Sequence, residues 1–84
     1  MIESIVILPS ALKHGLTEAS LKEAWTNFVA KRPRGDDCWV AIGFDCSGRE
    51  IEMVGLVTVD LEILIIHGMS PASEKMRREL GLGR

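Results

Sequence analysis

Short blocks of apolar and β-branched residues recur along the chain and are separated by polar residues, glycine or proline. The first block, residues 4–8 (SIVIL), predicts a strand that ends at Pro9, because proline fixes its own φ angle and has no amide hydrogen to donate. Residues 10–15 then have room for one or two helical turns. Gly15 closes this segment, since glycine readily takes the left-handed conformation that ends many helices.

The most regular pattern is helical. Apolar residues recur at intervals of three and four, which places them on one face of a helix over residues 18–30. Thr17 is the expected N-cap, and Glu18 lies at the positive end of the helix dipole. Lys31 and Arg32 lie at the negative end, where cations are favourable. The apolar stripe consists of Leu21, Ala24, Trp25, Phe28 and Val29.

The second half of the chain predicts three strands joined by tight turns. A polar linker at residues 34–37 precedes them, and residues 45–48 (DCSG) and Asp60 mark the turns between them. Both faces of residues 54–66 are rich in Val, Leu and Ile, so these strands are expected to be central in the sheet, with the main helix covering one face. The expected strands of this antiparallel meander are residues 38–44, 49–59 and 61–67.

A last helix of about ten residues is expected near the C-terminus. Ser70 is the expected N-cap, Pro71 takes the first helical position, and Gly81 ends the helix. Ion pairs four residues apart are expected between Glu74 and Arg78 and between Lys75 and Glu79. The apolar stripe of this helix is Ala72, Met76 and Leu80.

Together these elements predict one α+β domain over residues 1–84. Its expected form is a small antiparallel sheet with the element order β-α-β-β-β-α and the main helix packed on one sheet face. With 84 residues, 46% of them hydrophobic and 26% charged, the chain has a globular composition, which excludes a disordered protein. A net charge of -2 argues against bulk coating of nucleic acid but leaves room for a local basic patch.

The cysteine content and the hydropathy of the chain indicate the cellular compartment in which the protein is expected. Cys38 and Cys46 are too few for a disulfide framework, and the first residues lack the basic region of a signal peptide. The longest apolar stretch, residues 61–66, is far shorter than the roughly 20 residues of a membrane span. We therefore expect a reduced cytoplasmic protein without a membrane segment.

Motifs for metal, nucleotide or hydrolase chemistry are missing from the sequence, so neither a metal nor a cofactor is expected. His67 is the most suggestive single residue, because it ends an apolar strand at the rim of the expected sheet. A two-residue loop before that strand would place Glu52 opposite His67, whereas a three-residue loop would place Met53 there. A carboxylate beside the imidazole would orient it for proton transfer. A partly buried histidine without chemistry is the alternative.

Basic residues form four groups along the chain. Arg77 and Arg78 are explained by the dipole of the last helix. Arg49 begins one expected strand and His67 ends the next, so both are expected at the same end of the sheet, where they would bind phosphate and move a proton. The four groups are Lys13 with His14, Lys31 with Arg32 and Arg34, Arg49, and Lys75 with Arg77 and Arg78.

Four short sequence motifs along the chain carry a resemblance to a known family. They are KHGL at residues 13–16, IG at 42–43, SGR at 47–49 and IIHGM at 65–69. In their order and spacing the chain resembles the BrnT-like toxins of bacterial toxin-antitoxin pairs, which have the RelE/ParE-type fold. The resemblance extends from Lys13 to Leu80.

The resemblance implies a cytoplasmic toxin that cleaves RNA without a metal, often on the ribosome, and that a small antitoxin protein holds inactive. Side chains would activate the ribose 2'-hydroxyl, stabilise the added charge and protonate the leaving oxygen. In the implied site Arg49 holds the phosphate, His67 is the acid or base, Lys13 or His14 completes the site, and Lys75 and Arg78 grip the RNA backbone.

Two other functions fit the same expected fold, because a fold alone does not determine function. One is a non-catalytic interaction module that binds a protein partner or a second copy of itself through the sheet and the last helix. The other is a toxin of the ParE kind that poisons gyrase. The acidic net charge of -2 favours the interaction module, whereas the family resemblance favours the ribonuclease.

Overall fold

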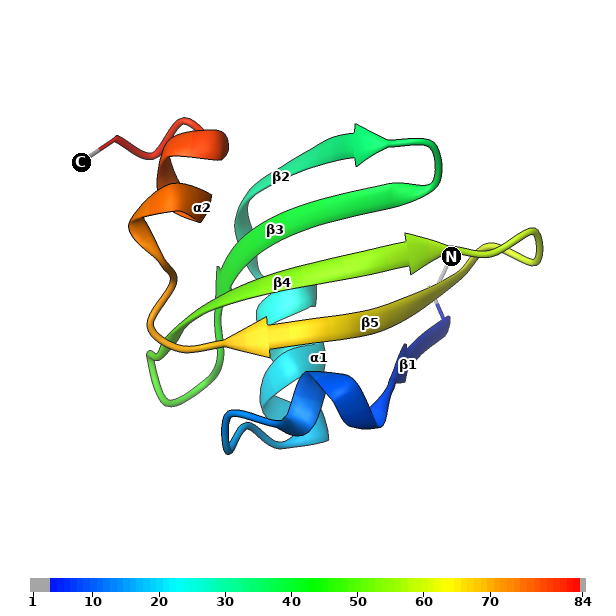
Figure 1. Ribbon diagram of the computed structural model, residues 1–84. Coiled ribbons are helices and arrows are strands. Elements are labelled where there is room, and N and C mark those ends of the chain that lie inside the picture. The colour runs from blue at the N-terminus through cyan, green and yellow to red at the C-terminus, as the bar shows by residue number, and fades with distance from the viewer. Residues whose placement is uncertain (1–3, 84) are drawn as a thin grey trace.

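A computed structural model of the chain describes residues 4–83 and shows a small α+β domain built on one mixed sheet (Figure 1). Five strands lie in the order β1-β5-β4-β3-β2. β1 runs parallel to β5, and the other neighbouring strands are antiparallel. The strands are β1 (Ser4–Ile7), β2 (Phe28–Gly35), β3 (Cys38–Phe44), β4 (Glu50–Val57) and β5 (Glu62–Met69). The helices are the 3-10 helix η1 (Pro9–Leu12), α1 (Glu18–Thr26) and α2 (Glu74–Glu79).

Strand β2 is the main departure from the sequence-based expectation. The helix predicted over residues 18–30 ends at Thr26, and the chain continues as an edge strand paired with β3. An edge position suits this segment, because Pro33 and the charged residues beside it are tolerated where one side of the strand has no partner. The predicted order β-α-β-β-β-α is therefore wrong by one strand, and the predicted antiparallel sheet is mixed, because β1 pairs in parallel with β5. Phe28 and Val29 are exposed on β2 instead of lying on the helical stripe.

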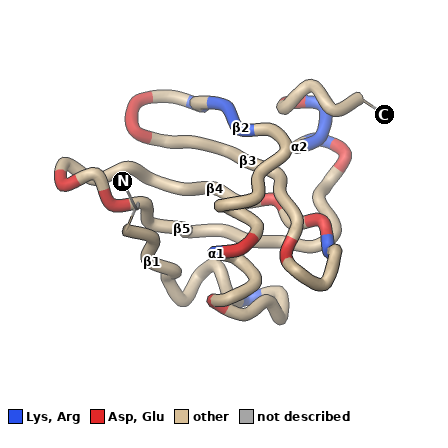
Figure 2. The backbone as a smooth tube through the Cα atoms, turned by 180° about the vertical axis from the view of Figure 1, so that it is seen from behind, with Lys and Arg blue, Asp and Glu red and all other residues tan. Residues whose placement is uncertain are grey.

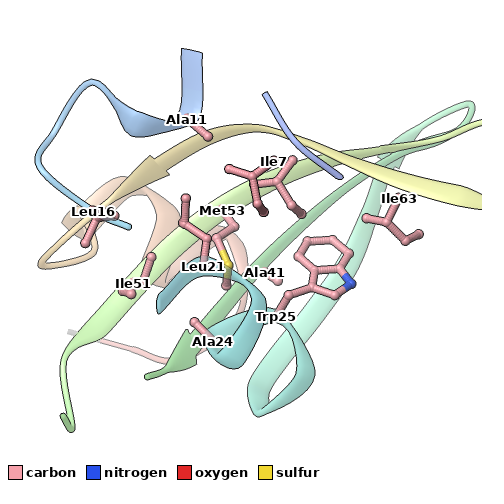
Figure 3. Close-up of a cluster of buried hydrophobic side chains, with 11 residues drawn as sticks. Ile7, Ala11, Leu16, Leu21, Ala24, Trp25, Ala41, Ile51, Met53 and Ile63 are labelled. Atoms are coloured by element: carbon pink, nitrogen blue, oxygen red, sulfur yellow. The ribbon is translucent and has the colours of Figure 1, made fainter. Parts of the chain in front are cut away.

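Helix α1 covers one face of the sheet. Thr17 caps it as predicted, since its hydroxyl accepts a hydrogen bond from the Ser20 amide at 3.0 Å. The helix packs so close to β3 that a Cβ at Gly43 would lie 1.9 Å from the carbonyl oxygen of Ala24. Figure 3 shows the α1 side chains Leu21, Ala24 and Trp25 directed at the sheet. The buried residues of this core are Ile7, Ala11, Leu16, Leu21, Ala24, Trp25, Ala41, Ile51, Met53, Ile63 and Ile65.

Helix α2 packs on the opposite face and forms a second, smaller core. It is shorter than predicted and begins after Ser73, whose hydroxyl accepts from the Met76 amide at 3.1 Å, so Ser70 is not its cap. Carboxylates of β4 hold the residues before the helix, because Glu50 accepts from the Ala72 amide and Glu52 from the Ser73 amide. The buried members of this core are Val40, Ile42, Val54, Met76 and Leu80.

The hairpin between β4 and β5 contains an unusual backbone conformation. The Leu61 amide donates to the Thr58 carbonyl at 2.9 Å, which closes a tight turn, and Leu61 itself has a φ of 64°. Glycine or asparagine is the ordinary residue in this left-handed region, because a Cβ crowds the following carbonyl oxygen. The turn between β3 and β4 meets the same demand with Gly48, whose φ is 83°.

The contact between α1 and β3 predicts that replacement of Gly43 by alanine destabilises the protein by about 3 kcal/mol or more, because two backbone segments must separate. Replacement of Gly35 by alanine is the matched control, since nothing lies within 4 Å of its added Cβ. Urea unfolding of the two variants measures the difference. Equal stability of the two would contradict the close packing of α1 on β3.

The strained hairpin predicts that replacement of Leu61 by glycine stabilises the protein. Removal of the Cβ relieves about 1–2 kcal/mol of strain, and the greater freedom of glycine in the unfolded chain offsets part of it. We expect a net gain of about 0.5–1 kcal/mol, or about 4 °C in Tm, in a thermal melt. Val59→Gly, in the same hairpin but without a positive φ, is the control and should not gain stability.

Candidate functional site

The candidate site is built around an imidazole and a buried carboxylate on the α2 face of the sheet. The Nε2 atom of His67 lies 2.8 Å from Oε2 of Glu52. Glu52 is only 5% exposed, whereas the His67 side chain is 35% exposed and so remains open to a ligand. The pair combines a positioned proton carrier with a fixed negative charge.

The strand register places the pair differently from either expectation. His67 lies opposite Val54 and Glu52 lies opposite Met69, with an irregularity in the pairing between Val54 and Gly55. Neither the predicted pairing of His67 with Glu52 nor that with Met53 is present. The contact still forms, because Val54 and Glu52 are two positions apart on one face of β4 and a long side chain reaches its diagonal neighbour.

Glu52 is held in its charged form. Burial raises its pKa, but the Ser73 amide, which donates to Oε1 at 2.7 Å, and the imidazole of His67 outweigh burial and hold the pKa below the usual range for a glutamate. The ionised carboxylate can only accept hydrogen bonds, so we assign the proton on His67 to Nε2. Nδ1 of the neutral ring is then free to accept a proton from a ligand.

A second imidazole, that of His14, lies beside the first. The ring centroids of His14 and His67 are 6.0 Å apart, with an angle of 77° between the ring planes. η1 brings His14 there, because the Ser10 hydroxyl donates to the Ile66 carbonyl of β5 at 2.6 Å and anchors the segment to the sheet. Lys13, the neighbouring predicted residue, is exposed.

A pocket of about 290 Å³ opens next to His67, between the sheet and α2. Lys75 lines it, and this places one of the predicted RNA-binding residues in the same pocket as the imidazole. Arg34 of β2 also lines it and donates from Nε and Nη2 to the two carboxylate oxygens of Glu79, at 3.0 and 2.8 Å. These hydrogen bonds lower the pKa of Glu79. The lining residues are Arg34, Glu52, Val54, His67, Ser73, Lys75, Met76 and Glu79.

Arg49 does not join this group. Its guanidinium donates to Asp45 from Nε and to Ser20 of α1 from Nη2, both at 2.9 Å. The Arg49 amide and guanidinium lower the pKa of Asp45, although burial opposes them. Because Ser20 belongs to α1, Arg49 is bound on the α1 face, whereas the His67 pocket lies on the α2 face. Arg49 and His67 do lie at the same end of the sheet, as expected from the antiparallel pairing of β4 with β5, but on opposite faces, so they do not form one cluster.

Six basic residues lie on β2 and α2, which are side by side (Figure 2): Lys31, Arg32, Arg34, Lys75, Arg77 and Arg78. The predicted pair of Arg78 with Glu74 is present at 3.5 Å on the exposed surface, where it contributes little to stability. The predicted pair of Lys75 with Glu79 is replaced by that of Arg34 with Glu79, which only the position of β2 makes available. Arg34 is thus a pocket residue that sequence reasoning assigned to a linker.

Two further kinds of feature, a metal site and a membrane-spanning helix, can be assessed for the residues that the structure describes. Across residues 4–83, histidine, cysteine and acidic side chains do not gather in groups of three or more that could hold a metal ion. Over the same residues, none of the helices is both long and apolar enough to cross a membrane.

The lowered pKa of Glu52 predicts a pH-dependent contribution to stability. The contribution is fully present above the unfolded-state pKa of 4.5 and is lost as the pH falls through the lower folded-state pKa. Glu52→Gln should therefore be much less stable than wild type at neutral pH, and the difference should shrink near about pH 3. Urea unfolding at both pH values tests this, with the exposed Asp36→Asn as control. A difference that does not change with pH would contradict it.

Comparison of the chain with protein-family models, with curated proteins and with solved structures finds no match, so the candidate site is interpreted from its own geometry.

Proposed function

We propose that this chain is the toxin of a toxin-antitoxin pair and that it cleaves RNA without a metal ion. The observation that carries the proposal is the contact of two imidazoles, His14 and His67, of which one is oriented by the buried carboxylate of Glu52. Two neighbouring groups that can accept and donate protons are what cleavage by an internal hydroxyl requires. The family resemblance of the sequence supports the same chemistry.

In the proposed reaction, Nδ1 of His67 takes the proton from a ribose 2'-hydroxyl. The oxygen attacks the adjacent phosphorus while the bond to the 5'-oxygen breaks, and protonated His14 gives its proton to that leaving oxygen. The products are a 2',3'-cyclic phosphate and a 5'-hydroxyl. Glu52 is a positioning residue, because it holds the His67 ring and stabilises the imidazolium that forms.

The phosphate is assigned to Lys75, the cation of the pocket that has no ion-pair partner among residues 4–83. Arg34 is less suited, because Glu79 already occupies two of its donors. Arg78 and Lys13 are exposed and would contact the RNA backbone outside the pocket. Arg49 lies on the other face, so we give it a structural role at the turn between β3 and β4.

The finer fold assignment and the partners belong to the same proposal. We place the fold in the RelE/ParE type. In this assignment β1, β5, β4 and β3 form the sheet that α1 covers, and β2 is an additional strand at its edge. The proposed partners are RNA and a cognate antitoxin protein, and the proposed compartment is the cytoplasm. A non-catalytic interaction module is the second candidate, favoured by the exposed apolar hairpin between β4 and β5.

The catalytic proposal is tested by incubating the purified protein with end-labelled single-stranded RNA in the presence of a chelator. Wild type should cut the RNA and leave a cyclic phosphate, and His67→Ala should lower the rate at least about 100-fold. His14→Ala should lower it as well, and Lys22→Ala, on the outer side of α1, should leave it unchanged. Cleavage that survives loss of His67 would refute the assigned site.

Induced expression tests the toxin part of the proposal in cells. Growth should stop with wild type and continue with His67→Ala at matched soluble protein levels. Arg49→Ala distinguishes a structural role of this residue on the α1 face from a catalytic one. It should impair growth arrest only to the extent that it lowers the amount of folded protein. Normal growth with folded wild type, together with intact RNA in the cleavage assay, would favour the interaction module.

A further inference from the structure

Arg34 reaches the pocket beside His67 from an irregular point of the edge strand β2. The pairing of β2 with β3 shifts between Pro33 and Gly35, so Arg34 has no partner of its own on β3. An extra residue of this kind forms a β-bulge, which changes the direction of side chains and is common next to active sites. Arg34 lines the pocket, and 43% of its side chain is exposed. A ligand in the pocket can therefore reach its guanidinium.

The guanidinium of Arg34 has two edges, each of which can donate two parallel hydrogen bonds. Glu79 occupies the first edge, since Nε and Nη2 donate to its two oxygens at 3.0 and 2.8 Å. The second edge consists of Nη1 and the remaining hydrogen of Nη2. Nη2 lies 3.9 Å from the sulfur of Met76, which is a weak acceptor, and Nη1 has no hydrogen-bond partner within residues 4–83. The second edge is thus available to a ligand.

Glu79 fixes the plane in which a ligand must approach. A guanidinium and a carboxylate that share two hydrogen bonds lie close to one plane. The pair joins β2 to the last residue of α2, so the arginine is held in place before any ligand binds. Glu79 is therefore a positioning residue, because it lowers the entropy that Arg34 loses on binding. The second edge requires two acceptors side by side in its own plane.

Phosphate oxygens and base edges are the two kinds of group in RNA that offer such acceptors. Glu79 offsets the charge of Arg34, and a phosphate on the second edge would lie close to this carboxylate and be repelled. The edge of a base carries no net charge and avoids the repulsion. Lys75, which forms no ion pair among residues 4–83, remains the partner of the phosphate. The second edge of Arg34 therefore favours a base.

Guanine is the base that matches this edge best. Its O6 and N7 atoms are adjacent acceptors in the plane of the ring, and they form the commonest specific contact of arginine with a base. Adenine places an amino group beside N7, so donors would face donors. Uracil has no two adjacent acceptors. Cytosine has them in N3 and O2, but a purine fills more of the pocket of about 290 Å³ and covers more of its apolar wall of Val54 and Met76.

We propose that the pocket beside His67 binds guanine, with O6 and N7 accepting hydrogen bonds from the second edge of Arg34. This inference rests on the proposed ribonuclease function and specifies its substrate. Because His67 and Arg34 line the same pocket, the ribose attached to the bound guanine carries the 2'-hydroxyl that His67 deprotonates. The RNA is then cut on the 3' side of guanosine, and the product ends in guanosine 2',3'-cyclic phosphate.

Binding of mononucleotides tests the base preference without cleavage. The four nucleoside 3'-monophosphates are titrated into the protein while proton NMR follows its two histidine rings, which His14→Ala assigns. Guanosine 3'-monophosphate should shift the His67 signals and bind about 10- to 100-fold more tightly than the others. Arg34→Lys keeps the charge but lacks the two-edged donor set, so it should lose most of the preference. Arg32→Lys, on the same strand and outside the pocket, should keep it.

Cleavage provides the second readout. DNA oligonucleotides that contain one ribonucleotide offer a single 2'-hydroxyl, and wild type should cut the guanosine version fastest, whereas Arg34→Lys should cut all four at similar rates. Thermal melts verify that the variants are folded. Equal binding of the four nucleotides, a preference for cytidine, or no binding up to about 10 mM would overturn the guanine proposal. Selective binding of the guanosine nucleotide without cleavage of any RNA would support the guanine pocket and refute the ribonuclease.

Discussion

The buried carboxylate of Glu52 is the constraint on which the α2 side of this domain depends. A carboxylate with 5% exposure is costly unless its oxygens find partners. Here the partners come from segments far apart in the sequence, the amide of Ser73 and the imidazole of His67. Glu52 therefore holds the backbone that leads into α2 and orients the partly exposed ring of His67 at the same time.

This arrangement also compensates for the short length of α2. A helix of six residues is unstable by itself, and Met76 and Leu80 provide it with only a small apolar contact. Glu50 and Glu52 accept hydrogen bonds from the amides of the residues before the helix, Arg34 donates to Glu79 near its end, and these contacts complete the docking. The pocket beside His67 exists because these polar contacts hold the helix near the sheet without filling the space between them.

Charge is distributed unevenly over the molecule, which the net charge of -2 conceals. Basic residues are concentrated along β2 and on α2, and aspartates occupy the β2–β3 and β4–β5 hairpins (Figure 2). Such separation allows an acidic protein to present a cationic surface beside a candidate active site.

Local patterns in the sequence were sufficient for the elements whose signals are local. The cap at Thr17, the glycine turn before Arg49 and the strands that became β3, β4 and β5 follow from spacing and residue type, whereas the contact of His67 with Glu52 depends on the register of β5 against β4. Residues 28–35 could not be assigned in this way, because Phe28 and Val29 continue the helical spacing and only pairing with β3 favours a strand.

Tertiary structure alone decided which candidate residues meet. A strand alternates its faces at every residue, so a small error in register decides whether two side chains share a face. Arg49 therefore lies with Ser20 on the α1 face, while His14 arrives beside His67 from a segment more than fifty positions away. The sequence by itself determined four of the five strands, β1, β3, β4 and β5, and the kinds of chemistry available, and long-range packing determined β2 and where that chemistry is assembled.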